Sequence, residues 1–261
     1  MVKLIAVDDG HGLETPGKRT PSFPDGMVMK ENEFNRVVAA YLDAHLKRCG
    51  FRTLLVAPGD TDIPLNNRTT AANNAMADFY ISIHANAYGA GWNGARGIET
   101  YYYPGSTAGK QAADIIHAQL VKGTPMPNRG VKEANFHVLR ESTMPAVLVE
   151  LGFMTNREDA ELLRSGAYRA ECAEELAKGI CQVFGVPYIP VSVVPDPIPD
   201  PDPDTDPDQP EEGTAVLSVE DANKIIPFLS AAYMATTDKE ARKEFNRLAN
   251  ELRKASGQEP Q

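Results

Sequence analysis

The sequence predicts an α/β domain, in which a twisted, mostly parallel sheet carries helices on both faces, followed by a small C-terminal helical hairpin. Two observations predict this. Over residues 1–187, short apolar segments alternate with longer segments of helical periodicity, a pattern typical of a helix-covered parallel sheet. At Tyr188 the composition changes abruptly to proline and aspartate. We therefore expect a domain over 1–187, a linker over 188–213 and a helical module over 214–261.

Five segments of the first domain are expected to be strands, because each is short, apolar and rich in β-branched or aromatic residues. These segments are Lys3 to Asp8, Arg52 to Val56, Asp78 to His84, Gly97 to Tyr103 and Ala146 to Glu150. In open α/β sheets, functional groups gather at the carboxyl ends of the strands. The ends of these segments are therefore the first place to look for a site.

The segments between the strands show helical periodicity. They are Glu33 to Cys49, Asn66 to Ala75, Gly109 to Leu120 and most of Glu158 to Phe184. His45 and His117 fall inside two of these helices, so they are expected to be surface or packing residues. Asn128 to Gly130 is expected to be a turn.

The linker alternates proline with aspartate and contains no lysine or arginine. Proline blocks helix and sheet formation, and like charges repel, so an extended spacer is expected. Beyond it, Ser218 and Thr237 are expected to begin two helices as N-caps. The second helix places five apolar residues on one face: Ala241, Phe245, Leu248, Ala249 and Leu252.

Charge and composition exclude several classes of protein. The net charge is -10, but residues 189–213 hold eight acids, so the remainder carries only -2. This balance lacks the basic patch of a nucleic-acid binder, and no apolar run is long enough for membrane insertion. We see no export signal, which predicts synthesis in the cytoplasm. The three cysteines lack metal-ligand spacing and are expected to be free thiols.

Three predicted strand ends carry groups that bind metals or move protons. His11 follows the first strand in Asp-Asp-Gly-His-Gly, His84 lies in Ser-Ile-His-Ala-Asn, and Glu150 ends Val-Leu-Val-Glu. A catalytic zinc ion is typically held by three nitrogen or oxygen ligands, with a carboxylate nearby as base. A third ligand could come from Glu31 or Glu33 at the start of the first helix, and the spacing does not choose between them.

These segments together resemble the zinc-dependent N-acetylmuramoyl-L-alanine amidases of the amidase_3 type. The resemblance covers residues 3–186 and includes Gly97 to Tyr102, Phe136 to Arg140 and Met144 to Asn156, in the family's order. It implies one zinc ion held by His11, Glu31 and His84, with Glu150 as the catalytic group. Two positions depart from the family pattern, which usually has proline at Asp9 and often glycine at Leu13.

The sequence leaves the roles of several neighbouring polar residues open. Asn86 and Arg140 are expected to contact substrate, although a structural role for Arg140 and for His137 fits the sequence equally well. Glu99 could support the site or simply face solvent.

The resemblance implies hydrolysis of the amide between N-acetylmuramic acid and L-alanine in peptidoglycan. With no visible export signal and a small tail, the chain looks like a phage or prophage endolysin that reaches the wall after release from the cytoplasm. A host enzyme acting after mother-cell lysis is the alternative origin. A zinc peptidase of the stem peptide and an inactive wall-binding protein are the rival functions. The C-terminal hairpin is expected to bind the wall or to self-associate.

Overall fold

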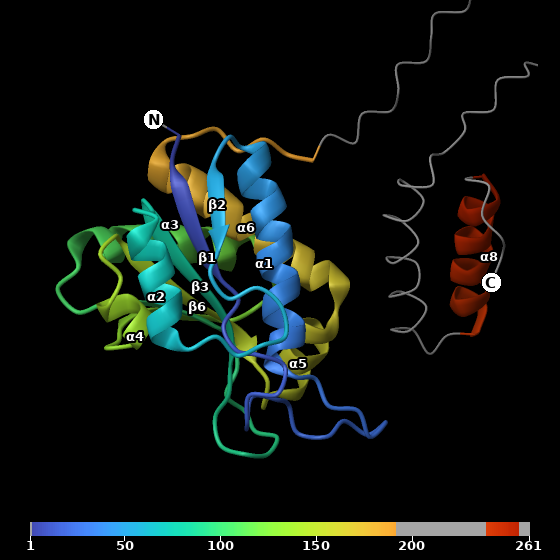
Figure 1. The fold of residues 1–261 in the computed structure, drawn as a ribbon. Coiled ribbons are helices and arrows are strands. Elements are labelled where there is room, and N and C mark those ends of the chain that lie inside the picture. Colours follow the sequence, from blue (N-terminus) through green and yellow to red (C-terminus); the bar gives the residue numbers. More distant parts are fainter. Residues whose placement is uncertain (1, 192–238, 256–261) are drawn as a thin grey trace, which may run out of the picture. The chain divides into compact units, whose positions relative to one another are not determined.

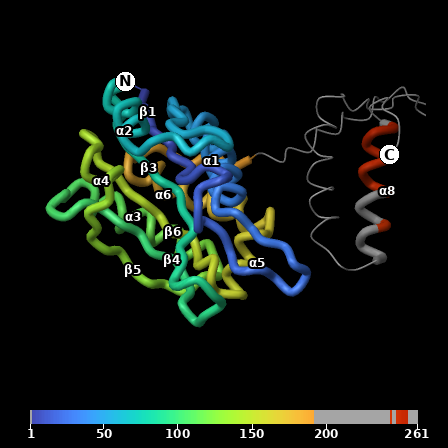
Figure 2. The backbone as a smooth tube through the Cα atoms, turned by 60° about the horizontal axis from the view of Figure 1, so that its bottom comes forward, coloured from blue at the N-terminus to red at the C-terminus, as the bar shows by residue number. Residues whose placement is uncertain are grey.

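The structure, a computed structural model, describes residues 2–191 and 239–255. Six strands form one sheet in the order β2-β1-β3-β6-β4-β5 (Figures 1 and 2). The strands are β1 (Leu4–Asp8), β2 (Arg52–Leu55), β3 (Phe79–Asn86), β4 (Ile98–Tyr102), β5 (Asn128–Glu133) and β6 (Ala146–Phe153). All neighbouring pairs are parallel except β4 and β6, which are antiparallel. The predicted fold class is confirmed.

Helices cover both faces of this sheet. They are α1 (Glu31–Arg48), α2 (Leu65–Asn74), α3 (Thr107–Gly123), the short α4 (His137–Arg140), α5 (Arg157–Arg164) and α6 (Gly166–Phe184). The larger hydrophobic core joins one face of the sheet to α1, α3 and α6, and a smaller core joins the other face to α2 and α4. The described residues include no helix long and apolar enough to cross a membrane.

The face of the sheet that carries the smaller core also carries polar side chains at the ends of its strands. Successive side chains of a strand point to opposite faces, so alternate residues share a face. On β3 the residues facing α2 and α4 are Tyr80, Ser82 and His84, and on β6 they are Ala146, Leu148 and Glu150. The apolar residues at the start of this face pack under the helices. Its polar residues lie at the carboxyl ends of the strands.

The structure differs from the predicted elements in two respects. Asn128 to Gly130, expected as a turn, is the start of edge strand β5. Gly130 has a φ of +86° inside this strand, and the register with β4 shifts between Ile98 and Thr100. This irregular, polar edge strand has the composition of a loop, which is why the sequence pattern misidentified it. Strands β3 and β6 also continue past His84 and Glu150, to Asn86 and Phe153.

The chain divides into two compact units, of which the first is Met1–Val191. Tyr188 and Ile189, expected in the linker, belong to this first unit: the Tyr188 hydroxyl lies 2.9 Å from Nδ1 of His45, and Ile189 N donates to Cys49 Sγ at 3.3 Å. All three cysteines are buried free thiols, as expected. Residues 192–213 of the linker and the first helix of the predicted hairpin lie outside the described residues.

In the second unit, the structure describes α8 (Lys239–Ala255). This helix is the second helix of the predicted hairpin. Ala249 is buried, and Leu248 and Leu252 are half-buried. The other two residues of the predicted apolar face, Ala241 and Phe245, have side chains outside the description.

Candidate metal centre

His84 and Glu150 lie side by side at the carboxyl ends of two central strands. Their Cα positions are partners in the parallel register of β3 and β6, so both side chains leave the same face of the sheet. Glu99 of β4 is the antiparallel partner of Glu150. The three residues therefore form a row across three adjacent strands.

His11 reaches this face from the turn after β1. Gly10 allows the turn, because it has a φ of +71° and because an added Cβ would lie 2.5 Å from Asn35 Nδ2 and 2.8 Å from the Ile83 carbonyl oxygen. Asn32 Nδ2 donates to the carbonyl oxygen of His11 at 2.7 Å. The backbone that carries His11 is thus held from α1.

Glu31 is the first residue of α1 and its side chain is 1% exposed. Its Oε1 accepts hydrogen bonds from Ala85 N at 3.2 Å and from Asn35 Nδ2 at 3.3 Å. Glu33 has a different role, since its Oε2 accepts a hydrogen bond from Lys30 N at 2.7 Å and caps the helix. The structure therefore brings Glu31, and not Glu33, to the two histidines.

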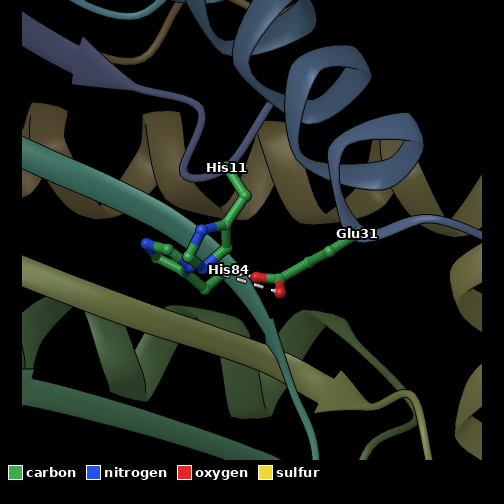
Figure 3. A group of neighbouring side chains, drawn as sticks. All are labelled: His11, Glu31 and His84. Carbon is green, nitrogen blue, oxygen red and sulfur yellow. Dashed lines mark hydrogen bonds and ion pairs between the residues drawn. The ribbon is translucent and has the colours of Figure 1, made fainter. Parts of the chain in front are cut away.

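The three predicted ligands form one cluster (Figure 3). His84 Nδ1 lies 2.9 Å from Glu31 Oε1, and His11 Nε2 lies 3.8 Å from Glu31 Oε2. One donor atom from each residue falls within 4.8 Å of the others, a spacing suited to one ion. Within the described part of the chain, Glu31 Oε2 is buried without a hydrogen-bond partner, and Lys18 Nζ lies 3.8 Å from it. A buried carboxylate oxygen is costly to leave without a hydrogen bond. Two imidazoles and one carboxylate are a ligand set that suits zinc.

The ionisation of the cluster favours a cation. Burial lowers the pKa of His11 to about 4, so its imidazole is neutral at pH 7. Burial would raise the pKa of Glu31, but the hydrogen bond and charge of His84 lower it instead. Burial likewise opposes charge on His84, and its hydrogen bond to Glu31 raises its pKa. The hydrogen bond to Glu31 thus favours a proton on His84 Nδ1, and a metal ion at the cluster would compete with that proton.

Glu150 is placed as a proton acceptor beside this cluster. Burial is the main cause that raises the pKa of its carboxyl to about 8; the charge of His84 opposes this rise and that of Glu31 adds to it. Its Oε2 is buried without a hydrogen-bond partner among the described residues. A half-buried carboxyl with a free oxygen next to a candidate metal site has the position and the raised pKa of a general base.

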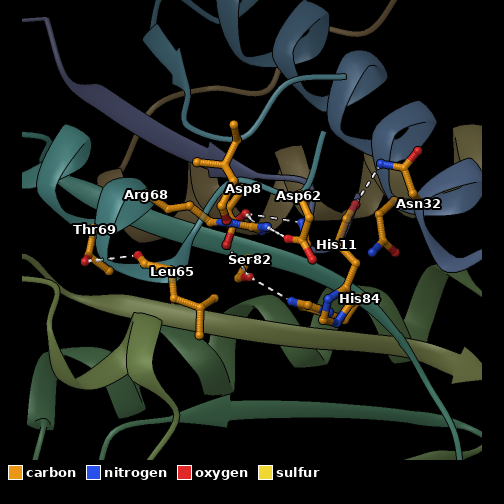
Figure 4. A network of polar contacts seen from close by, with 12 residues as sticks. Asp8, His11, Asn32, Asp62, Leu65, Arg68, Thr69, Ser82 and His84 are labelled. Carbon is orange, nitrogen blue, oxygen red and sulfur yellow. Dashed lines mark hydrogen bonds and ion pairs between the residues drawn. The ribbon is translucent and has the colours of Figure 1, made fainter. Parts of the chain in front are cut away.

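A buried polar network contacts His84 at Nε2, the ring nitrogen that does not face Glu31 (Figure 4). Ser82 Oγ lies 3.1 Å from His84 Nε2 and donates to Asp8 Oδ2 at 2.8 Å. Asp8 also accepts from Tyr80 Oη at 3.0 Å and from Arg68 Nη1 at 2.8 Å. The sequence pattern had not singled out Ser82 or Arg68. Their only sequence signal was polar character at a strand end and within a helix.

Asp9, which departs from the family pattern, is buried next to this network. It is 5% exposed, and its Oδ1 has no hydrogen-bond partner among the described residues. Burial, with the nearby charge of Asp8, raises its pKa to about 7. The substitution leaves the positions of the three candidate ligands compatible with one ion.

The remaining predicted residues have identifiable contacts. Asn86 Nδ2 donates to Glu99 Oε2 at 2.9 Å, so Asn86 lies at the site, and Glu99 is a buried supporting residue and not a solvated one. Arg140 contacts Asn135 and Glu141, and no contact in the described part of the chain joins it to the cluster. Its role in substrate binding therefore stays a prediction, as does that of Asn86.

Two histidines outside the cluster are packing residues, as expected. His117 Nδ1 lies 2.9 Å from Thr100 Oγ1, and its Nε2 lies 2.8 Å from Asn128 Oδ1. His45 contacts Arg48 and Tyr188. Both side chains are buried, and none of these contacts involves a candidate ligand.

An α/β sheet that carries a His-Glu-His cluster and an adjacent carboxylate at its strand ends has the arrangement of a hydrolase with a candidate metal centre. Comparison with known proteins gives the family. The Amidase_3 family model, described as N-acetylmuramoyl-L-alanine amidase, matches residues 5–182. The chain therefore belongs to the Amidase_3 family of N-acetylmuramoyl-L-alanine amidases and is an enzyme of this class.

Individual relatives agree with this assignment. The N-acetylmuramoyl-L-alanine amidase CwlM of Bacillus licheniformis is 37% identical over 187 residues, which cover 71% of this chain and 70% of that protein. The endolysin of Bacillus phage SPP1 is 31% identical over 71% of this chain and 68% of its own length. The crystal structure of an N-acetylmuramoyl-L-alanine amidase from Clostridium difficile 630 superposes with a TM-score of 0.65 at 33% identity, covering 70% of this chain and 97% of that one.

Proposed function

We propose that this enzyme is a zinc-dependent amidase that hydrolyses the bond between the lactyl group of N-acetylmuramic acid and L-alanine in peptidoglycan. The observation that carries the proposal is the cluster of His11, Glu31 and His84 beside Glu150, one oxygen of which has no hydrogen-bond partner in the part of the chain that the structure describes. These residues supply three ligands and a base, the set that metal-assisted amide hydrolysis requires. Family membership supplies the choice of substrate.

In this account, Glu150 moves the proton. When bound, zinc would polarise the lactyl carbonyl and lower the pKa of a nearby water. Glu150 accepts a proton from this water, whose oxygen attacks the carbonyl carbon. Glu150 then donates the proton to the alanine nitrogen as the carbon–nitrogen bond breaks. A nearby positive charge would lower the raised pKa of Glu150, which makes the carboxylate available as a base.

Digestion of purified peptidoglycan, followed by mass spectrometry of the fragments, tests this function. We expect new amino groups on L-alanine alone, loss of cleavage with a chelator and recovery on addition of zinc. New amino groups on other residues would instead identify a peptidase of the stem peptide. Absence of cleavage by the zinc-loaded protein would indicate an inactive wall-binding protein.

We also propose that the biological role is that of a phage or prophage endolysin, made in the cytoplasm and acting on the wall after release. The likeness to the endolysin of Bacillus phage SPP1 supports this role. The test is expression in a susceptible host, with and without a membrane-permeabilising protein. We expect lysis only after permeabilisation, whereas lysis of cells with intact membranes would contradict it.

For residues 214–261 we propose wall targeting. A second attachment point raises the effective concentration of the catalytic unit at an insoluble polymer. Self-association through Leu248 and Leu252 is the competing use. A truncation after Val191 keeps the first unit whole, including the contacts of Tyr188 with His45 and of Ile189 with Cys49, and separates these roles. Targeting predicts weaker sedimentation with whole walls at unchanged mass in solution. A smaller oligomer with unchanged sedimentation would favour self-association.

A further inference from the structure

The row of polar side chains at the candidate metal centre continues past Glu150 toward the edge of the sheet. Glu99 on β4 is the register partner of Glu150, and Lys132 on β5 is the partner of Tyr101. Tyr101 and Glu99 lie two residues apart on one strand and therefore share a face. Lys132 is thus placed on the same face as Glu150, two strands away.

Glu99 holds two cations at this edge. Its Oε1 accepts hydrogen bonds from Arg129 Nε at 2.6 Å and from Lys132 Nζ at 2.5 Å, and its other oxygen accepts from Asn86 Nδ2 and from the Tyr101 hydroxyl. Burial would raise the pKa of Glu99, but the bonds from Lys132, Tyr101 and Arg129 lower it. Glu99 is therefore ionised and fixes both cations in place.

One carboxylate does not neutralise two cations, so Arg129, Lys132 and Glu99 together carry a net charge of +1. The side chains of Arg129 and Lys132 are 37% and 39% exposed, whereas that of Glu99 is 4% exposed. The Arg129 guanidinium also lies over the Phe153 ring, 4.9 Å from its centroid. Among the described residues, its terminal nitrogens have no hydrogen-bond partner. The excess positive charge thus faces solvent with donors available.

We propose that Arg129 and Lys132 form a subsite for a carboxylate of the peptide stem. This inference rests on the proposed amidase function, which places the scissile amide at Glu150. The lactyl carboxyl of the glycan is consumed in that amide, so the anionic groups of the substrate lie on its peptide side. Ionised donors make the strongest hydrogen bonds to a carboxylate, and arginine binds it in a bidentate manner.

The distance between β6 and β5 identifies which carboxylates of the peptide stem can reach Arg129 and Lys132. Adjacent strands are about 4.8 Å apart, so β5 lies roughly 10 Å from β6. An extended peptide spans about 3.3 to 3.6 Å per residue, so roughly 10 Å corresponds to two or three residues beyond the cut bond. The carboxylates of the second and third stem residues fall in this range. Glu99 is a positioning residue for the subsite, since it holds both cations without being exposed itself.

A matched pair of soluble muramoyl tripeptides tests the subsite with the zinc-loaded, full-length enzyme. The two substrates differ only in whether the carboxyl groups of the second and third stem residues are free or amidated. Because charged hydrogen bonds are the interactions gained, we expect the native enzyme to prefer the free acid by roughly 10-fold in kcat/KM. The preference is expected in KM, and added salt should reduce it.

Two single variants, Arg129→Gln and Lys132→Gln, each leave Glu99 with one cationic partner, so the fold is retained. We expect each to reduce the preference toward equality, and Lys132→Arg to restore it. Lys110→Gln is the matched control: Lys110 is also an exposed lysine bonded to one carboxylate, that of Asp114, but lies on α3. It should leave the preference unchanged.

The outcomes separate this inference from the function on which it rests. Equal cleavage of both substrates by the native enzyme would contradict the subsite and leave the amidase function standing. A preference that survives both single variants would also contradict it. Cleavage of neither substrate would overturn the amidase function and the subsite with it.

Discussion

Ser82 Oγ lies 3.1 Å from Nε2 of His84, and this contact determines which nitrogen of the imidazole faces the cluster. Because the Ser82 hydroxyl donates its own proton to Asp8, Ser82 is left to accept a proton from Nε2. Nδ1 is therefore the atom offered to a metal, 2.9 Å from Glu31. Partners of this kind orient a histidine ligand and fix its tautomer.

Ser82→Ala should weaken zinc binding while the fold is retained. The variant removes the acceptor for Nε2 of His84, and loss of such a partner typically costs about 10- to 100-fold in metal affinity. Competition with a chromogenic chelator measures this change. Ser142→Ala is the control, because the Ser142 hydroxyl donates to the Val138 carbonyl in α4, away from the cluster. Equal zinc affinity in both variants would exclude the orienting role of Ser82.

Gly10→Ala should destabilise the protein more than Gly17→Ala. Both glycines have positive φ values, +71° and +75°, so both substitutions share a backbone cost of about 1 kcal/mol. Only at Gly10 would the added Cβ meet neighbouring atoms, at Asn35, Ile83 and His84. Such overpacking costs about 1 to 3 kcal/mol more. Urea unfolding of the two variants measures the difference, and equal losses would show that the close approach is unimportant.

Arg68→Met should be strongly destabilising. Arg68 and Asp8 are 2% and 1% exposed, so the substitution leaves a buried carboxylate without its ionic partner, at a cost of about 3 to 5 kcal/mol. Arg36→Met removes a surface pair with Asp60 and should cost about 0 to 1 kcal/mol. Thermal or urea unfolding compares them. Similar losses of unfolding free energy in the two variants would show that the buried Arg68–Asp8 pair contributes no more stability than the surface pair.

Glu150→Gln should change how the stability of the metal-free protein depends on pH. Burial raises the pKa of Glu150 from 4.5 to about 8, so the folded protein retains a proton that the unfolded chain loses. The carboxyl therefore destabilises the fold increasingly as pH rises from about 4.5 to 8. Glutamine does not titrate. The free energy of unfolding of the variant, relative to the native protein, should increase between pH 5 and pH 8, and a constant difference would contradict the raised pKa.

Much of the fold and most of the candidate centre could be predicted from the sequence, because each polar residue follows an apolar strand. His11, His84 and Glu150 stood out for that reason. Glu31 did not, since two acids begin α1. Only the three-dimensional contacts show that Glu33 caps the helix and that Glu31 contacts His84. In the sequence, only the family resemblance distinguishes Glu31 from Glu33 as a ligand.

The positive edge of the site could not be predicted, for a physical reason. Asn128, Arg129 and Gly130 have the composition of a turn, and β5 lacks the alternation of a half-buried strand. Pairing with β4 makes this segment a strand despite its local preference. The roles of Ser82 and Arg68 cannot be predicted from the sequence pattern, because they come from contacts with Asp8, which is distant from both in sequence.

Zinc content per chain, measured in the purified native protein and in two variants, tests the account most directly. The central claim is that His11, Glu31 and His84 hold the ion and that Glu150 serves the chemistry without being needed to hold it. We predict one zinc ion per chain in the native protein and in Glu150→Gln, with amidase activity only in the former, and almost no zinc in His84→Ala. Stoichiometric zinc in His84→Ala, or a Glu150→Gln variant with near-native activity, would contradict the account.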